Sequence, residues 1–466
     1  MKKYWKLFKD FITFGIGSLG SKIILFFLVP LYTNYLTTSD FGISELVSTC
    51  VQLAVPIVSL VVYDGVLRFC LSKSVKKEDV LVSSFIVVLI GSAILIVSLP
   101  VFESVSSFGQ WKYYFFFYSV MCMINYIFLN YIKGIGKNKL YAVSNILQTC
   151  FLAALNIVLL IVLKAGIKGY LLANILSLIV GVLVMGIFGS VFKDLFRGSF
   201  DSVLTKKMLL FSAPLVLNNI SWWAIHSSDK LMLDAMIDTS AVGIYSVAAK
   251  IPSLINVFIT IFAQAWNISA VNEFENSSKD SAYFKNIFFI NYSLIVLICS
   301  LAIVFKNPFI VFFVGNDFAA AGIYIPFLLV ASVFNCISSF FGSIYSASKK
   351  TINNMLTTII AAIVNVGINF ILIRKIGVIG AAFGTLVAYF VLSAIRLFDA
   401  RRYIHFRINF VLLLSNLIIL VGQSSLVTFF EIPMWASFLF FAALLCLNGA
   451  CYILIVRRVK KWKRSI

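Results

Sequence analysis

Charged and amide side chains recur inside long apolar runs of this 466-residue chain, at spacings that place them on single helix faces. Glu45, Ser48 and Gln52 follow i, i+3 and i+7 in the second run, and Lys22 lies near the middle of the first. A charged group in an apolar span usually faces the protein interior or a water-filled cavity, because exposure to lipid costs several kcal/mol. These residues therefore predict a polar cavity within a helical membrane protein.

Two later runs carry equivalent polar faces. Asn219, Trp222 and His226 follow i, i+3 and i+7 in the seventh run, and Lys250 begins a polar face that continues along the eighth. The candidate cavity-lining, substrate-binding residues are Lys22, Gln52, Asn219, His226, Lys250, Gln264 and Asn267. The candidates for gating or ion coupling are Glu45, Asp229 and Lys230.

Each candidate also has a purely structural interpretation. Lys22 could form a structural ion pair, Glu45 could bond a nearby loop, and Asp229 with Lys230 could be interfacial. His226 could be a hydrogen-bonded packing residue, although a histidine can also couple transport to protons. The sequence leaves these alternatives open.

The composition predicts an all-α polytopic membrane protein. Hydrophobic residues make up 61% of the chain and charged residues 12%, against about 25% charged in soluble domains. Runs of about 20 apolar residues, each able to cross a bilayer, recur from end to end. We predict about fourteen spans, at 11–33, 41–65, 80–102, 112–132, 141–163, 168–192, 208–228, 242–268, 286–305, 322–346, 352–373, 378–398, 408–428 and 434–456. The run 308–314 is too short to span and predicts an interfacial or re-entrant piece.

Cysteine usage and motifs predict no cofactor. The 8 cysteines are scattered, and no C-x-x-C pair occurs, so neither a metal site nor a disulfide framework is expected. The chain has no nucleotide-binding Gly-x-x-x-x-Gly-Lys loop, so transport energy would come from coupling to H⁺ or Na⁺, or from consumption of the product.

The distribution of basic residues predicts the orientation. With the N-terminus in the cytoplasm, 29 of the 38 Lys and Arg residues fall in cytoplasmic segments and 7 in outer loops. This bias predicts that both termini are cytoplasmic. Attraction to anionic lipid explains the C-terminal RRVKKWKRSI without any nucleic acid partner.

A weak internal repeat predicts the domain organisation. TNYLTTSDFGISELVS resembles LDAMIDTSAVGIYSVA, with Gly42 matching Gly243, and the offset contains six spans. An even number of spans gives both copies the same orientation, which predicts two parallel six-helix bundles, 1–200 and 201–400. Residues 401–466 add two helices and a basic cytoplasmic tail. A cleft between two bundles that rock against each other favours a transporter, and the short outer loops disfavour a membrane enzyme.

The chain opens with an apolar span, a short loop ending in Phe41-Gly42, and a second span that ends in Gly65 and Arg68-Phe69. In these features it is similar to bacterial polysaccharide flippases of the Wzx type. These belong to the superfamily that also holds multidrug-extruding MATE transporters and the lipid II flippase.

The stretch SSDKLMLDAMIDTSAVGIYSVAAKIPSLI resembles the seventh and eighth spans of the same family. Asp229, Gly243 and Tyr245 match the family pattern, whereas Lys230 replaces the usual Arg, which keeps the charge and loses the bidentate fork. The resemblance covers nearly the whole chain and implies a MATE-like, V-shaped fold.

By this resemblance the substrate is an oligosaccharide on undecaprenyl pyrophosphate, flipped from the inner to the outer leaflet of the bacterial cytoplasmic membrane. The product would serve O-antigen (lipopolysaccharide), capsule or exopolysaccharide synthesis, with a polysaccharide polymerase and a chain-length regulator as further candidate partners. An ion-coupled multidrug antiporter would prefer acidic groups in its cavity, so Lys22 and Lys250 argue against it. A membrane enzyme of polysaccharide assembly is the third possibility.

Overall fold

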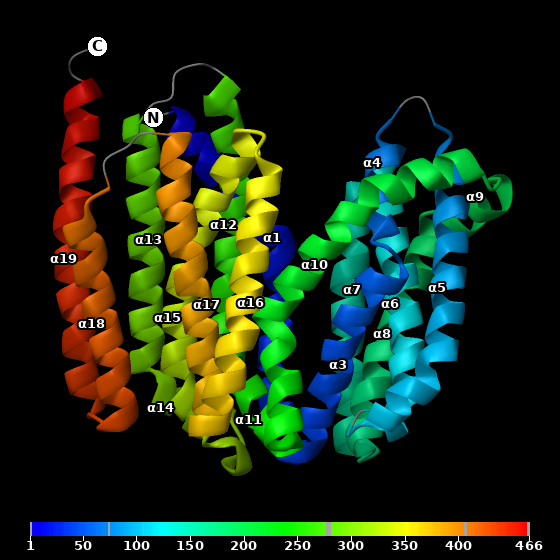
Figure 1. Cartoon of the computed structure of the whole chain (residues 1–466), viewed down its shortest axis with the longest axis horizontal. Helices are drawn as coiled ribbons and strands as arrows, with labels where there is room; N and C mark the ends of the chain where they lie inside the picture. Colours follow the sequence, from blue (N-terminus) through cyan, green and yellow to red (C-terminus); the bar gives the residue numbers. More distant parts are fainter. Residues whose placement is uncertain (1, 73–74, 106, 276–280, 405–407, 464–466) are drawn as a thin grey trace. The chain divides into compact units, whose positions relative to one another are not determined.

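The described part of the chain is built from helices joined by short turns (Figure 1). The computed structural model describes residues 2–72, 75–105, 107–275, 281–404 and 408–463, and contains no β-strand there. Helices suit an apolar chain of this kind because every backbone N–H and C=O inside a bilayer must find its partner within the protein. Side-chain caps begin several of them: Thr37 accepts from the Asp40 amide at 3.1 Å, and Asp201 from the Val203 amide at 2.9 Å.

Each predicted span coincides with one helix or with two consecutive helices. Twelve helical stretches of the described residues are long and apolar enough to cross a membrane. The predicted first span, in α1 (Lys2–Phe27) and the short helix after it, is not among these twelve. The predicted last span contains the shorter apolar stretch Met434–Gly449 of α19. The protein is an all-α polytopic membrane protein.

The chain forms two compact units, which we call the N-terminal unit, Ile23–Gly243, and the C-terminal unit, Met1–Lys22 with Ile244–Ile466. These units are defined by packing, whereas the division at residues 200 and 400 rests on the internal repeat and stays a prediction. The boundary near the start of the chain lies inside α1, whose residues up to Lys22 belong to the C-terminal unit.

Helix α6 lies at the centre of the N-terminal unit and packs against α3, α4, α5 and α8. Aromatic rings fill this contact, as where Phe115 of α6 stacks on Phe102 of α5 with ring centroids 4.3 Å apart. The helices of this unit are α2 (Val29–Tyr35), α3 (Thr38–Val58), α4 (Val62–Cys70), α5 (Lys77–Val105), α6 (Lys112–Gly134), α7 (Asn138–Asn156), α8 (Gly166–Phe188), α9 (Val191–Arg197), α10 (Ser202–Met236) and the start of α11 (Thr239–Ala248).

The predicted second span is broken in two. Leu60 and Val61 have φ values of 47° and 54°, so the chain turns in a left-handed conformation between α3 and α4. Pro56, inside the last turn of α3, also lacks the N–H that a regular helix would use. Helix α10 contains Pro214 and curves strongly along its length (Figure 1).

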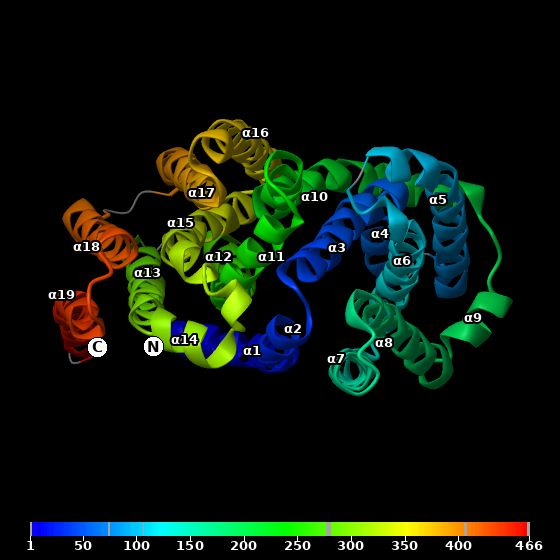
Figure 2. The same ribbon diagram turned by 90° about the horizontal axis from the view of Figure 1, so that it is seen from below.

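Helix α15 forms the core of the C-terminal unit and packs against α12, α13, α17 and α18 (Figure 2). Alanine, serine and glycine alternate with phenylalanine along α15, so its neighbours approach closely on all sides. The helices of this unit are the first 22 residues of the chain with α12 (Lys250–Glu275), α13 (Ser281–Val304), α14 (Lys306–Phe313), α15 (Ala321–Ala347), α16 (Thr351–Ile376), α17 (Val378–Asp399), α18 (Phe410–Phe429) and α19 (Met434–Lys463). The short α14 covers the predicted interfacial piece.

Buried amides hold α18 and α19 onto this unit, side by side in Figure 1. Asn416 and Asn448 exchange two hydrogen bonds of 3.0 and 2.8 Å. Gln423 accepts a hydrogen bond from the Ser300 hydroxyl of α13 at 2.7 Å and donates to the Ser437 hydroxyl at 3.0 Å. The two helices outside the predicted repeat are therefore an integral part of the C-terminal unit.

Two cations at helix ends are buried in this unit, Arg396 in the last turn of α17 and Lys306 at the start of α14. Arg396, 1% exposed, lies within α17 and donates to side-chain or backbone oxygens of α15 and α16. Lys306, 7% exposed, donates to the carbonyls of Gly322 and Val427 at 3.4 and 3.3 Å.

Candidate functional site

An ion pair joins α3 to α10 within the N-terminal unit. Lys230 Nζ lies 2.7 Å from Glu45 Oε2, and the two side chains are 14% and 9% exposed. The sequence leaves open whether Glu45 bonds a loop or acts in gating. In the structure its carboxylate pairs with a lysine on another helix. Breaking such a nearly buried pair costs about 3–5 kcal/mol, because it leaves one charge uncompensated.

One further hydrogen bond joins the same two helices, and the neighbouring acid Asp229 is buried in α10. Trp223 Nε1 donates to the Thr49 carbonyl at 3.0 Å, about one helical turn along α3 from Glu45. Asp229, 3% exposed, accepts from the Lys230 amide at 2.9 Å through Oδ1. An acid at this depth is not a solvated interfacial residue, so the structure places Asp229 inside the unit.

The polar face of α10 continues away from the ion pair. The His226 side chain is exposed, and its ring stacks on that of Trp222, with centroids 5.7 Å apart and planes at 19°. Asn219 is half-buried and donates to the Leu215 carbonyl at 2.9 Å. Gln52 is exposed on α3. These side chains can offer donors and acceptors to a bound polar molecule.

The second group of candidates lies in the C-terminal unit, on α1 and α12. At one end of this helix pair, Lys3 Nζ lies 2.8 Å from Glu273 Oε2. At the other end, Lys22 and Lys250 lie close enough for their positive charges to act on each other. Two lysines held together in this way raise the local positive potential, which favours an anionic ligand.

Amides continue the polar face of α12 beyond Lys250. Gln264 is exposed and Asn267 half-buried, so the side chains predicted to line a cavity reach the surface of the unit. Asn256, one turn before Thr260 on α12, accepts a hydrogen bond from Asn335 of α15 at 3.0 Å. This amide therefore joins α12 to α15. The outward face of α12 is therefore polar over most of its length.

The structure thus sorts the ten candidates into two groups. It brings Glu45 and Lys230 together in the N-terminal unit and Lys22 and Lys250 together in the C-terminal unit. The roles assigned to them stay predictions. The sequence reasoning missed Trp223, whose indole bonds the backbone of α3, although its position one residue from the polar stripe was a signal.

The described residues offer few groupings of metal-ligating side chains. Within that part of the chain, no group of three or more His, Cys, Asp or Glu side chains could hold a metal ion. The chemistry offered by the candidates is instead that of charge and hydrogen bonding.

The fold and these polar helices define a class of membrane protein, and comparison with known sequences and structures identifies it. The sequence pattern of the polysaccharide biosynthesis protein family matches residues 7–267, and that of the MatE family matches residues 214–371. The chain belongs to the polysaccharide biosynthesis protein family. No curated protein sequence matches it significantly.

Solved structures share the fold at low sequence identity. The lipid II flippase MurJ, in an inward closed conformation, is similar with a TM-score of 0.64 and 15% identity, over 95% of this chain and 98% of that chain. A MOP superfamily transporter from Pyrococcus furiosus has a TM-score of 0.62 and 17% identity, over 85% of this chain and 95% of that chain. An outward-facing multidrug resistance MATE family transporter has a TM-score of 0.62 and 16% identity, over 84% and 95%. The fold is MATE-like.

Proposed function

We propose that this protein is a flippase for an oligosaccharide carried on undecaprenyl pyrophosphate. It moves this lipid from the inner to the outer leaflet of the bacterial cytoplasmic membrane by alternating access, with both termini in the cytoplasm. The product feeds O-antigen, capsule or exopolysaccharide synthesis. It is a transporter rather than an enzyme, and its energy comes from H⁺ or Na⁺ coupling or from consumption of the product.

The observation that carries this proposal is that Lys22 and Lys250 lie near enough for their charges to act on each other, in a member of the polysaccharide biosynthesis protein family. A pyrophosphate is a compact anion, and two ammonium groups near each other can compensate its charge where little water is present. The amides of Gln264 and Asn267, on the same helix as Lys250, can meet sugar hydroxyls. The lipid chain can remain in the bilayer.

A multidrug antiporter is the second candidate, because residues 214–371 match the MatE pattern. A site that binds cationic drugs gains from carboxylates. The neighbouring lysines Lys22 and Lys250 would repel such ligands. We therefore favour the flippase.

The test is a flipping assay on the full chain in proteoliposomes that contain a fluorescent lipid-linked oligosaccharide. The fraction of label reached by an impermeant quencher measures transfer between leaflets. The double variant Lys22→Gln/Lys250→Gln should slow flipping at least about tenfold, since it removes two charge-assisted contacts of about 1.5–3 kcal/mol each. Lys22→Arg/Lys250→Arg should retain part of the activity.

The matched control is Lys168→Gln/Lys375→Gln, which removes two exposed lysines at the ends of other helices. It should flip at the wild-type rate. Wild-type flipping by the Lys22/Lys250 variant would remove the two lysines from the mechanism. Export of a cationic dye without any flipping would instead favour the antiporter.

A further inference from the structure

A cavity of about 640 Å³ lies among α4, α5 and α10 of the N-terminal unit, apart from the polar faces described above. Arg68, Lys76 and Lys207 line it, together with Asp79 and Asp201. The distribution of basic residues predicts that these helix ends face the cytoplasm. The charges of this cavity, and the groups that already use them, indicate what it can bind.

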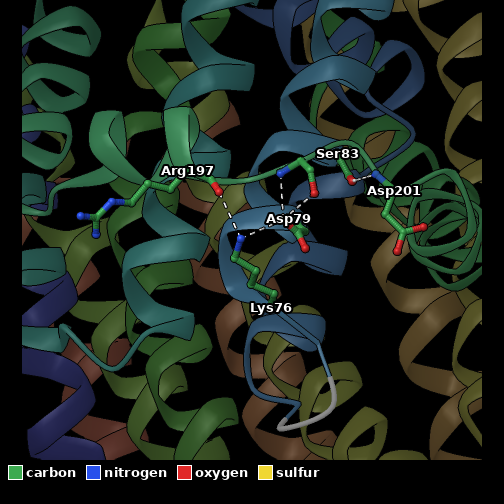
Figure 3. A network of polar contacts seen from close by, with 6 residues as sticks. Lys76, Asp79, Ser83, Arg197 and Asp201 are labelled. Atoms are coloured by element: carbon green, nitrogen blue, oxygen red, sulfur yellow. Dashed lines mark hydrogen bonds and ion pairs between the residues drawn. The ribbon is translucent and has the colours of Figure 1, made fainter.

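Both acids of the cavity are committed to the protein. The segment between α9 and α10 is tied to α5 through Asp79, whose Oδ1 accepts from the Ser199 amide at 2.8 Å and from its hydroxyl at 3.2 Å (Figure 3). Asp201 caps α10, accepting from the amides of Val203 and Leu204 at 2.9 and 3.0 Å. Backbone donors thus offset much of the negative charge of both carboxylates.

Lys76 belongs to the same framework. Its Nζ donates to the Arg197 carbonyl at 3.1 Å and lies 3.7 Å from Asp79 Oδ1 (Figure 3). The Asp201 amide completes the network by donating to the Ser83 hydroxyl at 3.4 Å. This network fixes one wall of the cavity without using the other two cations.

Arg68 and Lys207 are those two cations. Arg68 lies in the last turn of α4 and Lys207 in the second turn of α10. Both side chains are exposed. Neither forms an ion pair or a side-chain hydrogen bond with any residue that the structure describes. The cation whose charge acts on Asp64, one turn before Arg68 in α4, is Lys133.

Apolar side chains stand beside these cations. Leu71 is 67% exposed and Val203 62% exposed, and both line the cavity with Phe69. A free anion makes no use of an apolar rim, whereas a lipid places a phosphate next to its hydrocarbon chains. An arginine fork and an ammonium converging on one space suit a phosphate group.

We propose that this cavity binds the phosphate group of a lipid in the cytoplasmic leaflet, through Arg68 and Lys207. Two lipids carry this chemistry: an anionic glycerophospholipid of the bilayer, and a polyprenyl pyrophosphate. The site does not overlap the Lys22 and Lys250 pair, which belongs to the other unit. Its test is one of binding, so it stands or falls independently of the flipping assay.

The test measures binding by microscale thermophoresis on the detergent-solubilised full chain. The probes are dioctanoyl phosphatidylglycerol, undecaprenyl pyrophosphate and inorganic pyrophosphate. Arg68→Gln/Lys207→Gln should weaken binding of a lipid probe about tenfold, and Arg68→Lys/Lys207→Arg should restore most of it. The control, Lys139→Gln/Lys206→Gln, removes two exposed lysines outside the cavity and should change affinity less than about twofold.

Lys206 is a close match for Lys207, because it is the preceding residue of α10 and lines a separate apolar hollow with Leu60 and Phe200. An effect confined to phosphatidylglycerol assigns the site to a bilayer phospholipid, and one confined to undecaprenyl pyrophosphate assigns it to the carrier lipid. Equal affinities of the two double variants for every probe would overturn the proposal. Equal binding of inorganic pyrophosphate and the lipids would overturn its lipid part.

Discussion

Gly42 of α3 and Gly243 of α11 pack backbone to backbone. A Cβ atom on Gly42 would lie 3.0 Å from the Gly243 nitrogen, and one on Gly243 would lie 3.2 Å from the Gly42 nitrogen. Hydrogen bonds flank this contact on both sides, from Thr38 to Ser240 at 2.5 Å and from Ser39 to Thr239 at 2.7 Å. The two segments that match in the sequence repeat therefore touch each other reciprocally.

Gly42→Ala and Gly243→Ala should each destabilise the protein by about 1–3 kcal/mol, because a methyl group would overlap the carbonyl of Thr239 or of Thr38. Thermal unfolding of the purified protein in detergent measures the effect. Gly367→Ala is the control, since nothing lies within 4 Å of its would-be methyl group. It should stabilise α16 by up to about 1 kcal/mol. Equal responses of all three would mean that the close contact is not present.

The Glu45–Lys230 pair should show strong coupling in a double-mutant cycle. Glu45→Gln and Lys230→Gln should each lower the free energy of unfolding by about 3–5 kcal/mol, because each leaves a nearly buried charge without its partner. The double variant should be less damaged than the sum of the two. Additive effects, measured by chemical unfolding, would show that the two charges do not interact.

Neutral variants of the two buried acids test the gating prediction. Glu45→Gln and Asp229→Asn keep the side-chain shape and remove charge, so they should slow export while substrate binding is retained. A flipping assay and a binding assay on the same preparations separate the two properties. Flipping at the wild-type rate by both variants would reduce these acids to structural residues.

Two buried cations of the C-terminal unit should respond differently to replacement by methionine. Arg396 donates to Thr357 and Thr358 at 3.1 and 2.8 Å, so Arg396→Met should cost about 3–5 kcal/mol. Lys306 has two long hydrogen bonds, of 3.4 and 3.3 Å, to described residues, and burial lowers the pKa of its ammonium, with Glu431 acting in the opposite direction. Lys306→Met should be neutral or stabilising.

The pH dependence of stability follows from the direction in which the pKa of Lys306 is shifted. A lowered pKa in the folded state means that the unfolded chain binds more protons between that pKa and the ordinary value of 10.5. Stability contributed by Lys306 should therefore rise with pH across this window, and Lys306→Met should remove the rise. A thermal unfolding series in alkaline buffers, with Lys375→Met as the exposed control, measures it.

Cysteine labelling tests the orientation. Ser39 is a poor reporter of the outer side because its hydroxyl bonds Thr239 at 2.7 Å, whereas Lys375 is exposed at the end of α16. In a background without the 8 native cysteines, Lys375→Cys should react with an impermeant maleimide on intact cells. Lys139→Cys, exposed in the first turn of α7, should react only after permeabilisation. The reverse pattern would invert the topology.

The sequence predicts the helical elements well because hydrophobic length is a strong local signal. Every predicted span contains helix, and the short α14 appears where an interfacial piece is expected. What hydropathy cannot supply is the break at Leu60 and Val61, where the local chain is apolar throughout and only the backbone conformation changes. Hydropathy likewise does not predict that Arg396, near the end of its span, is buried. Its burial depends on acceptors that lie on α15 and α16.

The candidate site shows a similar limit. Helical spacing places Glu45, Asp229 and Lys230 on polar faces, but it does not say which of them meet. Their pairing depends on how α3 and α10 pack, including the Trp223 contact with the Thr49 carbonyl. The cavity lined by Arg68 and Lys207 is formed by three segments that lie far apart in the sequence. No single sequence motif therefore predicts it.

The boundary inside α1 has a consequence for how the protein is made. Lys3 pairs with Glu273, which is synthesised 270 residues later. At about 5–20 residues per second, Lys3 waits some tens of seconds for its partner. The C-terminal unit is therefore discontinuous in the gene, and a chain divided after Gly243 would yield a C-terminal fragment without Met1–Lys22, which belongs to that unit.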